Sequence, residues 1–200
     1  MKTKTPDRIE LAKALEKELN YKRFIHTMGV AATASCMAMR WGADAQKAEL
    51  AGLLHDCAKN LDLRKMLKIC EDARVQVSEI ERTSEALLHS KAGAVLAQTR
   101  YGVEDPEILG AIRCHTTGRP GMTLLEKILF IADYMEPGRD VAEDLPEVRR
   151  LAFTDLDACL LRILEDSLVY LETKGSRIDP MTESTCRYYQ SVRDGREEHV

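Results

Sequence analysis

The stretch LAGLLHDCAKN, which runs from Leu50 to Asn60, constrains the fold more than any other part of the sequence. It sets His55 and Asp56 into an apolar run with helical periodicity. Burying an unpartnered imidazole or carboxylate costs on the order of several kcal/mol, because such a group loses its hydrogen bonds to water. A chain that folds around this stretch must therefore bring further polar groups, or a cation, to meet these two side chains.

Apolar residues recur with helical periodicity along nearly the whole chain, and no segment shows the alternation of a half-buried strand. We therefore expect an all-α protein, a helical bundle. Thr123 and Glu126 carry the capping-box pattern at the start of one helix. The segment 74–86 stays ambiguous. The expected helices cover about residues 5–19, 21–40, 44–60, 62–73, 89–101, 105–115, 123–137, a segment from 145, 155–174 and a short helix after 180.

Composition narrows the class of function and the compartment. The formal net charge of −4 argues against a general nucleic-acid binder, although it leaves room for a local cationic pocket that takes a small anion. No apolar run approaches the ~20 residues of a membrane span, and the N-terminus lacks the apolar core of a secretory signal. The six cysteines form no C-x-x-C pair, which indicates reduced thiols. We expect a cytoplasmic protein with no membrane or nucleic-acid partner.

Four of the five histidines fall on or at the edge of separate expected helices, and two aspartates accompany them. Each of these residues alone has an ordinary explanation, as a satisfied core or capping group. Together they would need many independent hydrogen-bond solutions, whereas one metal site would satisfy them all. The residues are His26, His55, Asp56, His89, His115 and Asp133.

Helix geometry favours a shared site. With 3.6 residues per turn, His55 and Asp56 would point about 100° apart on one helix, and Lys59 would neighbour both. The two oxygens of Asp56 could bridge two cations. A histidine-rich set suits Fe, Mn, Co or Zn better than Mg. Six candidate ligands exceed what one catalytic metal needs, so we expect two divalent transition metal ions about 3.5–4 Å apart.

These residues resemble a known family. The pattern H…HD…D is that of the HD superfamily of phosphohydrolases. The blocks RFIHTMGVA, LAGLLHDCAKN, LLHSKAGA, HTTGRPGMTLLEKILFIADYMEPGR and IDPMTESTCRYY resemble, in order, those of the YqeK-type symmetrical bis(5′-nucleosyl)-tetraphosphatases. The resemblance covers about residues 21–190. It implies a dinuclear centre, with iron as the expected metal. His26, His55, Asp56 and Asp133 would hold one ion, and Asp56, His89 and His115 the other.

The resemblance also implies a reaction. Metal-bound hydroxide would attack a phosphorus of diadenosine tetraphosphate and give two ADP. Asp56 and Asp133 would orient the hydroxide, and either could accept its proton. A polyphosphate substrate needs further cations and hydrogen-bond donors. The candidates are Lys59, Thr116, Thr117, Gly118, Arg119 and Arg139.

Some of these candidates have simpler explanations. Lys59 could be a surface lysine with a buried stem. Arg139 could pair with an acidic residue at 140, 143 or 144, and Arg119 could be a solvated loop charge. Tyr134 and Met135 fit the core better than a contact with a nucleobase.

A length of 200 residues suits one domain, and with the resemblance it predicts a single HD domain over residues 1–200. Residues of about 21–135 would form the metal-binding core, about 145–190 would form helices packed on it, and 191–200 would be a disordered tail. The amphipathic helix at about 155–174 is expected to pack on this core, with a homodimer interface as the alternative.

Two other functions remain open from the sequence. One is an HD phosphohydrolase acting on another nucleotide, such as a nucleoside monophosphate, a deoxynucleoside triphosphate, a cyclic nucleotide or an alarmone. The other is a non-catalytic helical adaptor with a vestigial or structural metal site. A missing ligand would favour the adaptor, and none is missing.

Overall fold

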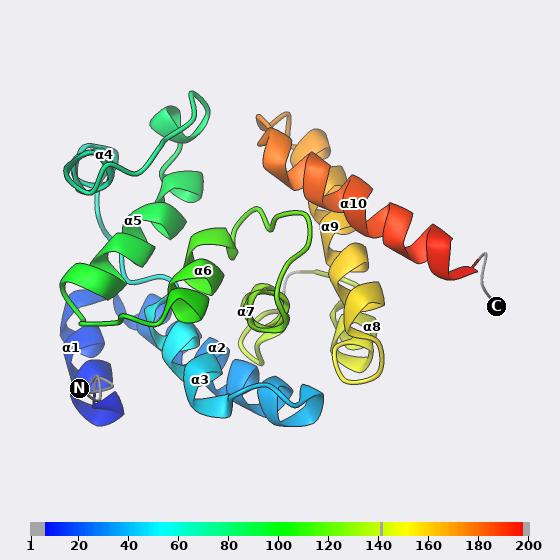
Figure 1. Cartoon of the computed structure of the whole chain (residues 1–200), viewed down its shortest axis with the longest axis horizontal. Coiled ribbons are helices and arrows are strands. Elements are labelled where there is room, and N and C mark those ends of the chain that lie inside the picture. The colour runs from blue at the N-terminus through cyan, green and yellow to red at the C-terminus, as the bar shows by residue number, and fades with distance from the viewer. Residues whose placement is uncertain (1–6, 141, 198–200) are drawn as a thin grey trace.

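The computed structural model describes residues 7–140 and 142–197, and every regular element in that part of the chain is helical. The expectation of an all-α protein is confirmed. Figure 1 shows the ten α-helices. Their bounds, with one short 3-10 helix η1, are α1 Arg8–Glu18, α2 Tyr21–Trp41, α3 Ala45–Leu54, α4 Leu63–Asp72, η1 Glu81–Thr83, α5 Glu85–Thr99, α6 Pro106–Cys114, α7 Leu124–Met135, α8 Leu145–Leu151, α9 Leu156–Thr173 and α10 Pro180–Glu197.

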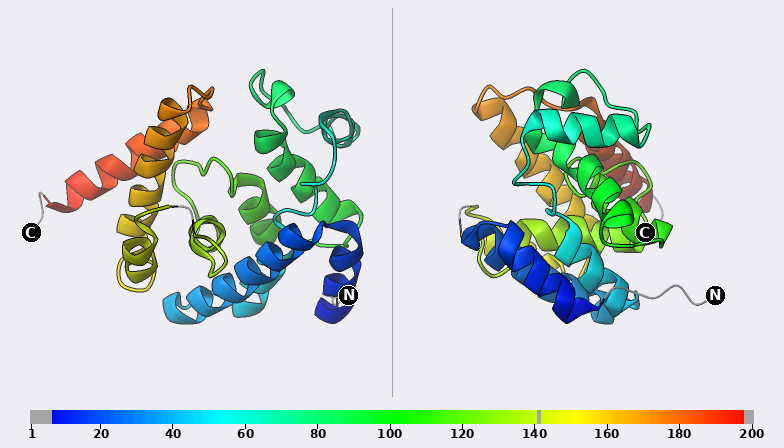
Figure 2. Two further views of the ribbon diagram at one scale, coloured as in Figure 1. Left: turned by 180° about the vertical axis from the view of Figure 1, so that it is seen from behind. Right: turned by 90° about the vertical axis from the view of Figure 1, so that its left-hand side faces the viewer.

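Helix α7 lies at the centre of the bundle. It contacts α2, α3 and α6 on one side and α8 and α9 on the other, and almost all of its residues from Leu125 to Ala132 are buried. In Figure 1 and in the view from behind in Figure 2, α1–α6 lie on one side of α7 and α8–α10 on the other. A side chain on α7 can therefore face a space bounded by both groups of helices.

A second, smaller core lies beneath α4. It is built from Ala58, Met66, Cys70, Leu88 and Ala92, all fully buried. Helix α4 packs on α5 through this core, and the irregular segment between them folds back onto α5. This core therefore holds the segment around η1 against α5.

Side-chain caps fix most helix starts where the sequence places them. The capping box of Thr123 and Glu126 is present at the start of α7. Asp7 caps α1, while the expected Thr5-Pro6 start lies outside the described residues. None of the helices in the described ranges is long and apolar enough to cross a bilayer.

The third helix ends earlier than its periodicity predicts. Helix α3 stops at Leu54, and residues 55–60 form consecutive turns, with the amide of Lys59 donating to the carbonyl of Asp56 at 2.9 Å. The ring Nδ1 of His55 lies 2.7 Å from the Gly52 carbonyl, which the amide of Asp56 would use in a continuing helix. The expectation that these residues share one helical surface is wrong for this reason.

The chain end also differs from expectation. Helix α10 has 18 residues, so residues 191–197 are helical rather than a disordered tail. It packs on α9, and the pairing reaches late positions: Gln190 donates to Glu165 at 3.1 Å, and Arg193 lies 3.8 Å from the same carboxylate. The hydroxyl of Tyr189 accepts the amide of Met122 at 2.9 Å. These contacts stabilise the C-terminal part of a helix that the sequence predicts only as a short one.

Helix α9, which covers most of the segment at about 155–174, contacts α7, α8 and α10 within this chain. Helix α5 begins at Glu85, four positions before the expected start at His89. The ambiguous segment before it is irregular apart from η1.

The close approach of α2 and α3 generates a prediction on stability. A Cβ at Gly52 would lie 2.6 Å from Cα and 2.9 Å from N of Ala31, both backbone atoms. Gly52→Ala should therefore lower the free energy of unfolding by about 1–3 kcal/mol, as overpacking does. Chemical denaturation measures this change. Gly195→Ala is the matched control, since nothing lies within 4 Å of its Cβ position, and it should leave stability equal or higher. Equal stability of Gly52→Ala and the parent would contradict this packing.

Candidate metal centre

Six side chains from five helices or their ends meet in the interior. They are the same six that the sequence nominates as metal ligands. Their nitrogen and oxygen atoms form three overlapping groups, and within each group all atoms lie within 4.8 Å of one another. The members are His26 on α2, His55 and Asp56 just after α3, His89 on α5, His115 just after α6 and Asp133 on α7.

One half of the cluster is built around His26. Its Nε2 lies 3.0 Å from Oδ1 of Asp133, 3.3 Å from Nε2 of His55 and 3.9 Å from Oδ2 of Asp56. Nε2 of His55 lies 3.5 Å from that same oxygen of Asp56. Two imidazoles and two carboxylates thus face one point.

The other half of the cluster uses the second oxygen of Asp56. Oδ1 of Asp56 lies 3.1 Å from Nε2 of His89 and 3.8 Å from Nε2 of His115, and the two imidazole nitrogens are 3.1 Å apart. The carboxylate of Asp56 therefore faces one pair of histidines with each oxygen, which is the arrangement of a bridging ligand.

The protonation of the rings tests whether this cluster fits a metal. Nδ1 of His55 and of His115 each lie 2.7 Å from a backbone carbonyl, that of Gly52 or Ile112, and so donate to it. Nδ1 of His26 lies 3.1 Å from a carboxylate oxygen of Glu136. In the neutral rings Nε2 then carries a lone pair, so acceptors face acceptors about 3 Å apart. A shared cation relieves this repulsion, and such hydrogen bonds on the outer nitrogen are usual for ligating histidines.

The carboxylates of the cluster stay ionised. Without a cation, protons take its place in the cluster. Burial alone would raise the pKa of Asp56, but the positive charge of a protonated His55 and hydrogen bonds from imidazole N–H groups hold it well below its usual range. Against its own burial, the pKa of His55 is raised by Asp56 and Asp133 in turn. Burial opposes ionisation of Asp133 as well, yet the hydrogen bond from His26 lowers the pKa of that carboxyl. Burial lowers the pKa of His89 to about 4, so this ring is neutral at pH 7. A divalent ion would displace the protons of the other rings, because ionised carboxylates and neutral imidazoles are the forms that bind such ions.

Two residues that contact the cluster were not predicted from the sequence. Nη1 of Arg23 lies 2.5 Å from Oδ2 of Asp56, and the buried carboxylate of Glu136 contacts Nδ1 of His26. Glu136 also accepts the amide of Gly138 at 2.6 Å. Spacing could have indicated both, because Arg23 precedes His26 by three positions on α2 and Glu136 follows Asp133 by three at the end of α7.

Two of the nominated cations lie at the cluster. Nζ of Lys59 lies 3.2 Å from both ring nitrogens of His89, and burial lowers the pKa of this amine. Nη2 of Arg139 lies 2.8 Å from Oδ1 of Asp133, and its Nε donates to the carbonyl of Asp133. Arg139 therefore pairs with a cluster carboxylate rather than with the acidic residues at 140, 143 or 144.

The loop after His115 contributes less than its sequence suggests. Oγ1 of Thr116 lies 3.5 Å from Nε2 of His89 and lines the cavity described below. Thr117 and Gly118 do not line that cavity, and the hydroxyl of Thr117 donates to the carbonyl of Gly118 at 3.0 Å. Arg119 lies 2.7 Å from the carboxylate of Glu126, so it has a partner away from the cluster.

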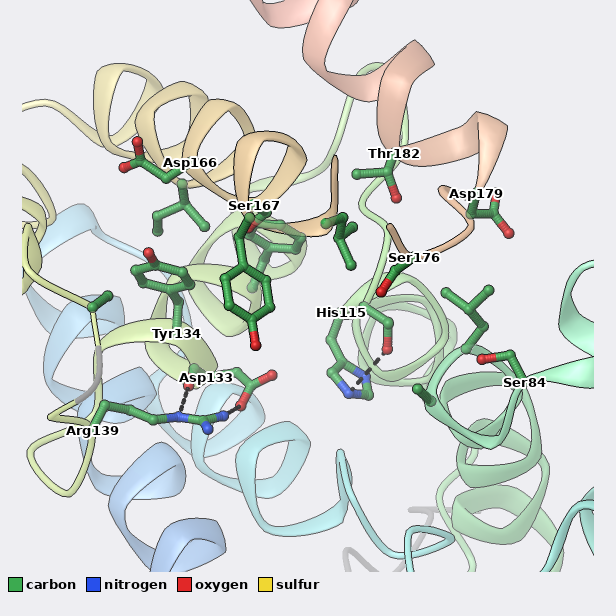
Figure 3. Close-up of a pocket in the computed structure, with 18 of the residues that line it drawn as sticks. Ser84, His115, Asp133, Tyr134, Arg139, Asp166, Ser167, Ser176, Asp179 and Thr182 are labelled. Carbon is green, nitrogen blue, oxygen red and sulfur yellow. Dashed lines mark hydrogen bonds and ion pairs between the residues drawn. The ribbon is translucent and has the colours of Figure 1, made fainter. Parts of the chain in front are cut away.

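A cavity of about 1270 Å³ opens from the cluster. It lies between the α5 side and the α9–α10 side of the bundle, and Figure 3 shows Asp133, Arg139 and His115 at its floor. Tyr134 lines this cavity although its sequence context suggests a core residue, whereas Met135 is buried as expected. The volume is large enough for a nucleotide-sized ligand.

Comparison with known proteins agrees with this geometry. The family model described as the HD domain matches residues 23–138. The symmetrical bis(5′-nucleosyl)-tetraphosphatase of Bacillus subtilis is 40% identical over 92% of this chain and 98% of its own length. The protein of the same name from Staphylococcus aureus is 39% identical over 90% of this chain and 94% of its own.

A solved structure has the same fold. The crystal structure of a predicted HD superfamily hydrolase involved in NAD metabolism from Clostridium acetobutylicum gives a TM-score of 0.90 at 37% identity, and the alignment covers 93% of this chain and 98% of that one. The matches include the helices that carry the six clustered side chains. The chain therefore belongs to the HD domain family and, within it, to the family of the symmetrical bis(5′-nucleosyl)-tetraphosphatases.

Proposed function

We propose that this protein is a metal-dependent hydrolase that cleaves diadenosine tetraphosphate symmetrically into two ADP. The observation that carries this proposal is the carboxylate of Asp56, which faces a pair of imidazoles with each of its oxygens at the floor of a nucleotide-sized cavity. The substrate is proposed by analogy with the relatives, symmetrical bis(5′-nucleosyl)-tetraphosphatases that are 40% identical to this chain.

The residues of the cluster fit two divalent ions. His26, His55, Asp56 and Asp133 would hold one, while Asp56, His89 and His115 would hold the other. Iron is the proposed metal, with Mn, Co or Zn as alternatives, because imidazole suits all four. When bound, such ions lower the pKa of a coordinated water and neutralise charge on phosphate oxygens.

The protein's own groups orient the reaction. The side chain of Asp133 is 23% exposed and that of Asp56 only 3%, so Asp133 is the carboxylate that can reach a water entering from the cavity. We assign to Asp133 the orientation of the attacking water and the acceptance of its proton. Arg139, which pairs with Asp133, keeps that carboxylate in place.

Three cations would bind the phosphate chain. Arg23, Lys59 and Arg139 all line the cavity next to the cluster. Their forked or compact donors suit phosphate oxygens, and the burial of Lys59 strengthens any interaction it makes. Thr116 adds a hydroxyl at the same place. The nominated phosphate contacts at Thr117, Gly118 and Arg119 remain a weaker proposal, since these residues do not line the cavity.

Product analysis tests the proposed function directly. The purified protein, analysed for bound metals, should convert diadenosine tetraphosphate into two equivalents of ADP. Release of ATP and AMP would contradict symmetrical cleavage, and turnover of another nucleotide alone would favour a different HD phosphohydrolase. Asp56→Ala should lose turnover and bound metal together, because both halves of the cluster depend on this residue.

Lys59 is predicted to act on substrate rather than on metal. Lys59→Ala should keep the metal content of the parent and lose about 10²-fold or more in kcat/KM, the loss expected when an electrostatic contact to a reacting phosphate is removed. Lys68→Ala removes an exposed lysine of α4 and serves as the control. Unchanged kinetics in Lys59→Ala would reduce the residue to a structural partner of His89.

Glu136 is predicted to position His26. Glu136→Gln keeps the size of the side chain but removes the charge that orients the imidazole, so metal affinity should fall by about 10–100-fold. Titration of the metal-free protein with Mn²⁺ or Zn²⁺ measures this change. Glu143→Gln is the control. Glu143 also comes after the end of α7, but within the part of the chain that the structure describes it forms no hydrogen bond or ion pair with a residue of the cluster. Equal affinity of Glu136→Gln and the parent would remove this role.

A further inference from the structure

The cavity extends well past the metal cluster. Beyond Asp133 and Arg139 it continues over Tyr134 and along α9, where Asp166 lines it. Figure 3 shows the phenol oxygen of Tyr134 facing the stretch of α9 that carries Asp166 and Ser167. The hydrolysis itself uses none of the side chains on α9, so this end of the cavity needs another explanation.

The charges at this far end disfavour phosphate. Glu143, Asp144 and Asp166 line it together with Arg162. Nε of Arg162 lies 2.6 Å from Oδ2 of Asp166 and 3.5 Å from Oδ2 of Asp144. One guanidinium therefore serves two carboxylates, while a third stands nearby. Burial, together with the adjacent Asp166, raises the pKa of Asp144, which shows how crowded the negative charge is. A polyphosphate would be repelled here, whereas a group with N–H or O–H donors would be accepted.

The ring of Tyr134 adds a flat apolar surface beside these acceptors. Tyr134 follows Asp133 directly on α7, so a group lying on its ring is next to the cluster. Its hydroxyl lies 3.5 Å from Oδ1 of Asp144. An aromatic face combined with fixed hydrogen-bond acceptors is a common way to bind a nucleobase.

We propose that Tyr134 and Asp166 form the nucleoside subsite of the cavity, in which the base stacks on the ring of Tyr134 and its N–H groups donate to the carboxylate of Asp166. Arg162 positions that carboxylate. The proposal rests on the proposed function, because it takes the phosphates to bind at the cluster. The subsite defines the orientation of the substrate in the cavity: the phosphate chain lies at the cluster beside Arg23, Lys59 and Arg139, and one nucleoside lies along α9.

Binding measurements test the subsite without relying on turnover. The dissociation constants of ADP and of inorganic pyrophosphate are measured by calorimetry on the metal-loaded protein. Asp166→Asn and Tyr134→Leu should each weaken ADP about tenfold, the effect of losing one charged hydrogen bond or one stacking contact. Both should leave pyrophosphate binding unchanged, since it has no nucleoside. Glu172→Gln, which removes an exposed carboxylate of α9 outside the cavity lining, should change neither.

The contrast between the two ligands decides the result. Parent-like ADP binding in both variants, or equal weakening of ADP and pyrophosphate, would overturn the subsite. In the parent, 2′-deoxyADP should bind with the same dissociation constant as ADP. If 2′-deoxyADP instead binds more weakly than ADP to the parent but equally well to Asp166→Asn, the donor to Asp166 is the ribose hydroxyl. That result would overturn the contact with the base. Failure of the parent to cleave diadenosine tetraphosphate would instead count against the proposed function, while the ADP contrast would still decide the subsite.

Discussion

Four imidazole nitrogens and two ionised carboxylates point at one small volume in the interior of this protein. Because the outer nitrogens of His26, His55 and His115 are already engaged as donors, the inner nitrogens face one another as acceptors. Such an arrangement is unfavourable for the bare side chains and favourable around cations. The rest of the fold can be understood as the means of holding these groups against their mutual repulsion.

Helix ends do much of this work. His55 and His115 each sit at the C-terminal end of a helix, α3 and α6, and each ring bonds to a carbonyl three residues earlier. The same type of hydrogen bond thus orients two imidazole rings at the ends of separate helices. Helix α7 passes between the two groups of helices and supplies Asp133 to the cluster and Tyr134 to the cavity. Metal site and cavity are therefore adjacent because consecutive residues of one central helix belong to each.

The sequence predicted the class of fold, most helix starts and the convergence of the six clustered side chains, because caps and apolar spacing are local and the motif residues are distinctive. It could not predict the end of α3, since the bond between His55 and Gly52 competes with the helix only in the folded chain. It missed Arg23 and Glu136 because a charged residue near a motif has many ordinary explanations. It extended the phosphate site to Arg119, whose partner Glu126 lies on the following helix.

The carboxylate of Glu136 occupies a space that two glycines leave open. A Cβ at Gly29 would lie 2.4 Å from Oε2 of Glu136, and one at Gly138 would lie 3.0 Å from Oε1. Neither glycine touches the cluster, yet a single methyl group at either would push this carboxylate away from His26. The space available around Glu136 therefore limits which substitutions the protein tolerates, as charge does. This limit applies even to positions that contribute no ligand.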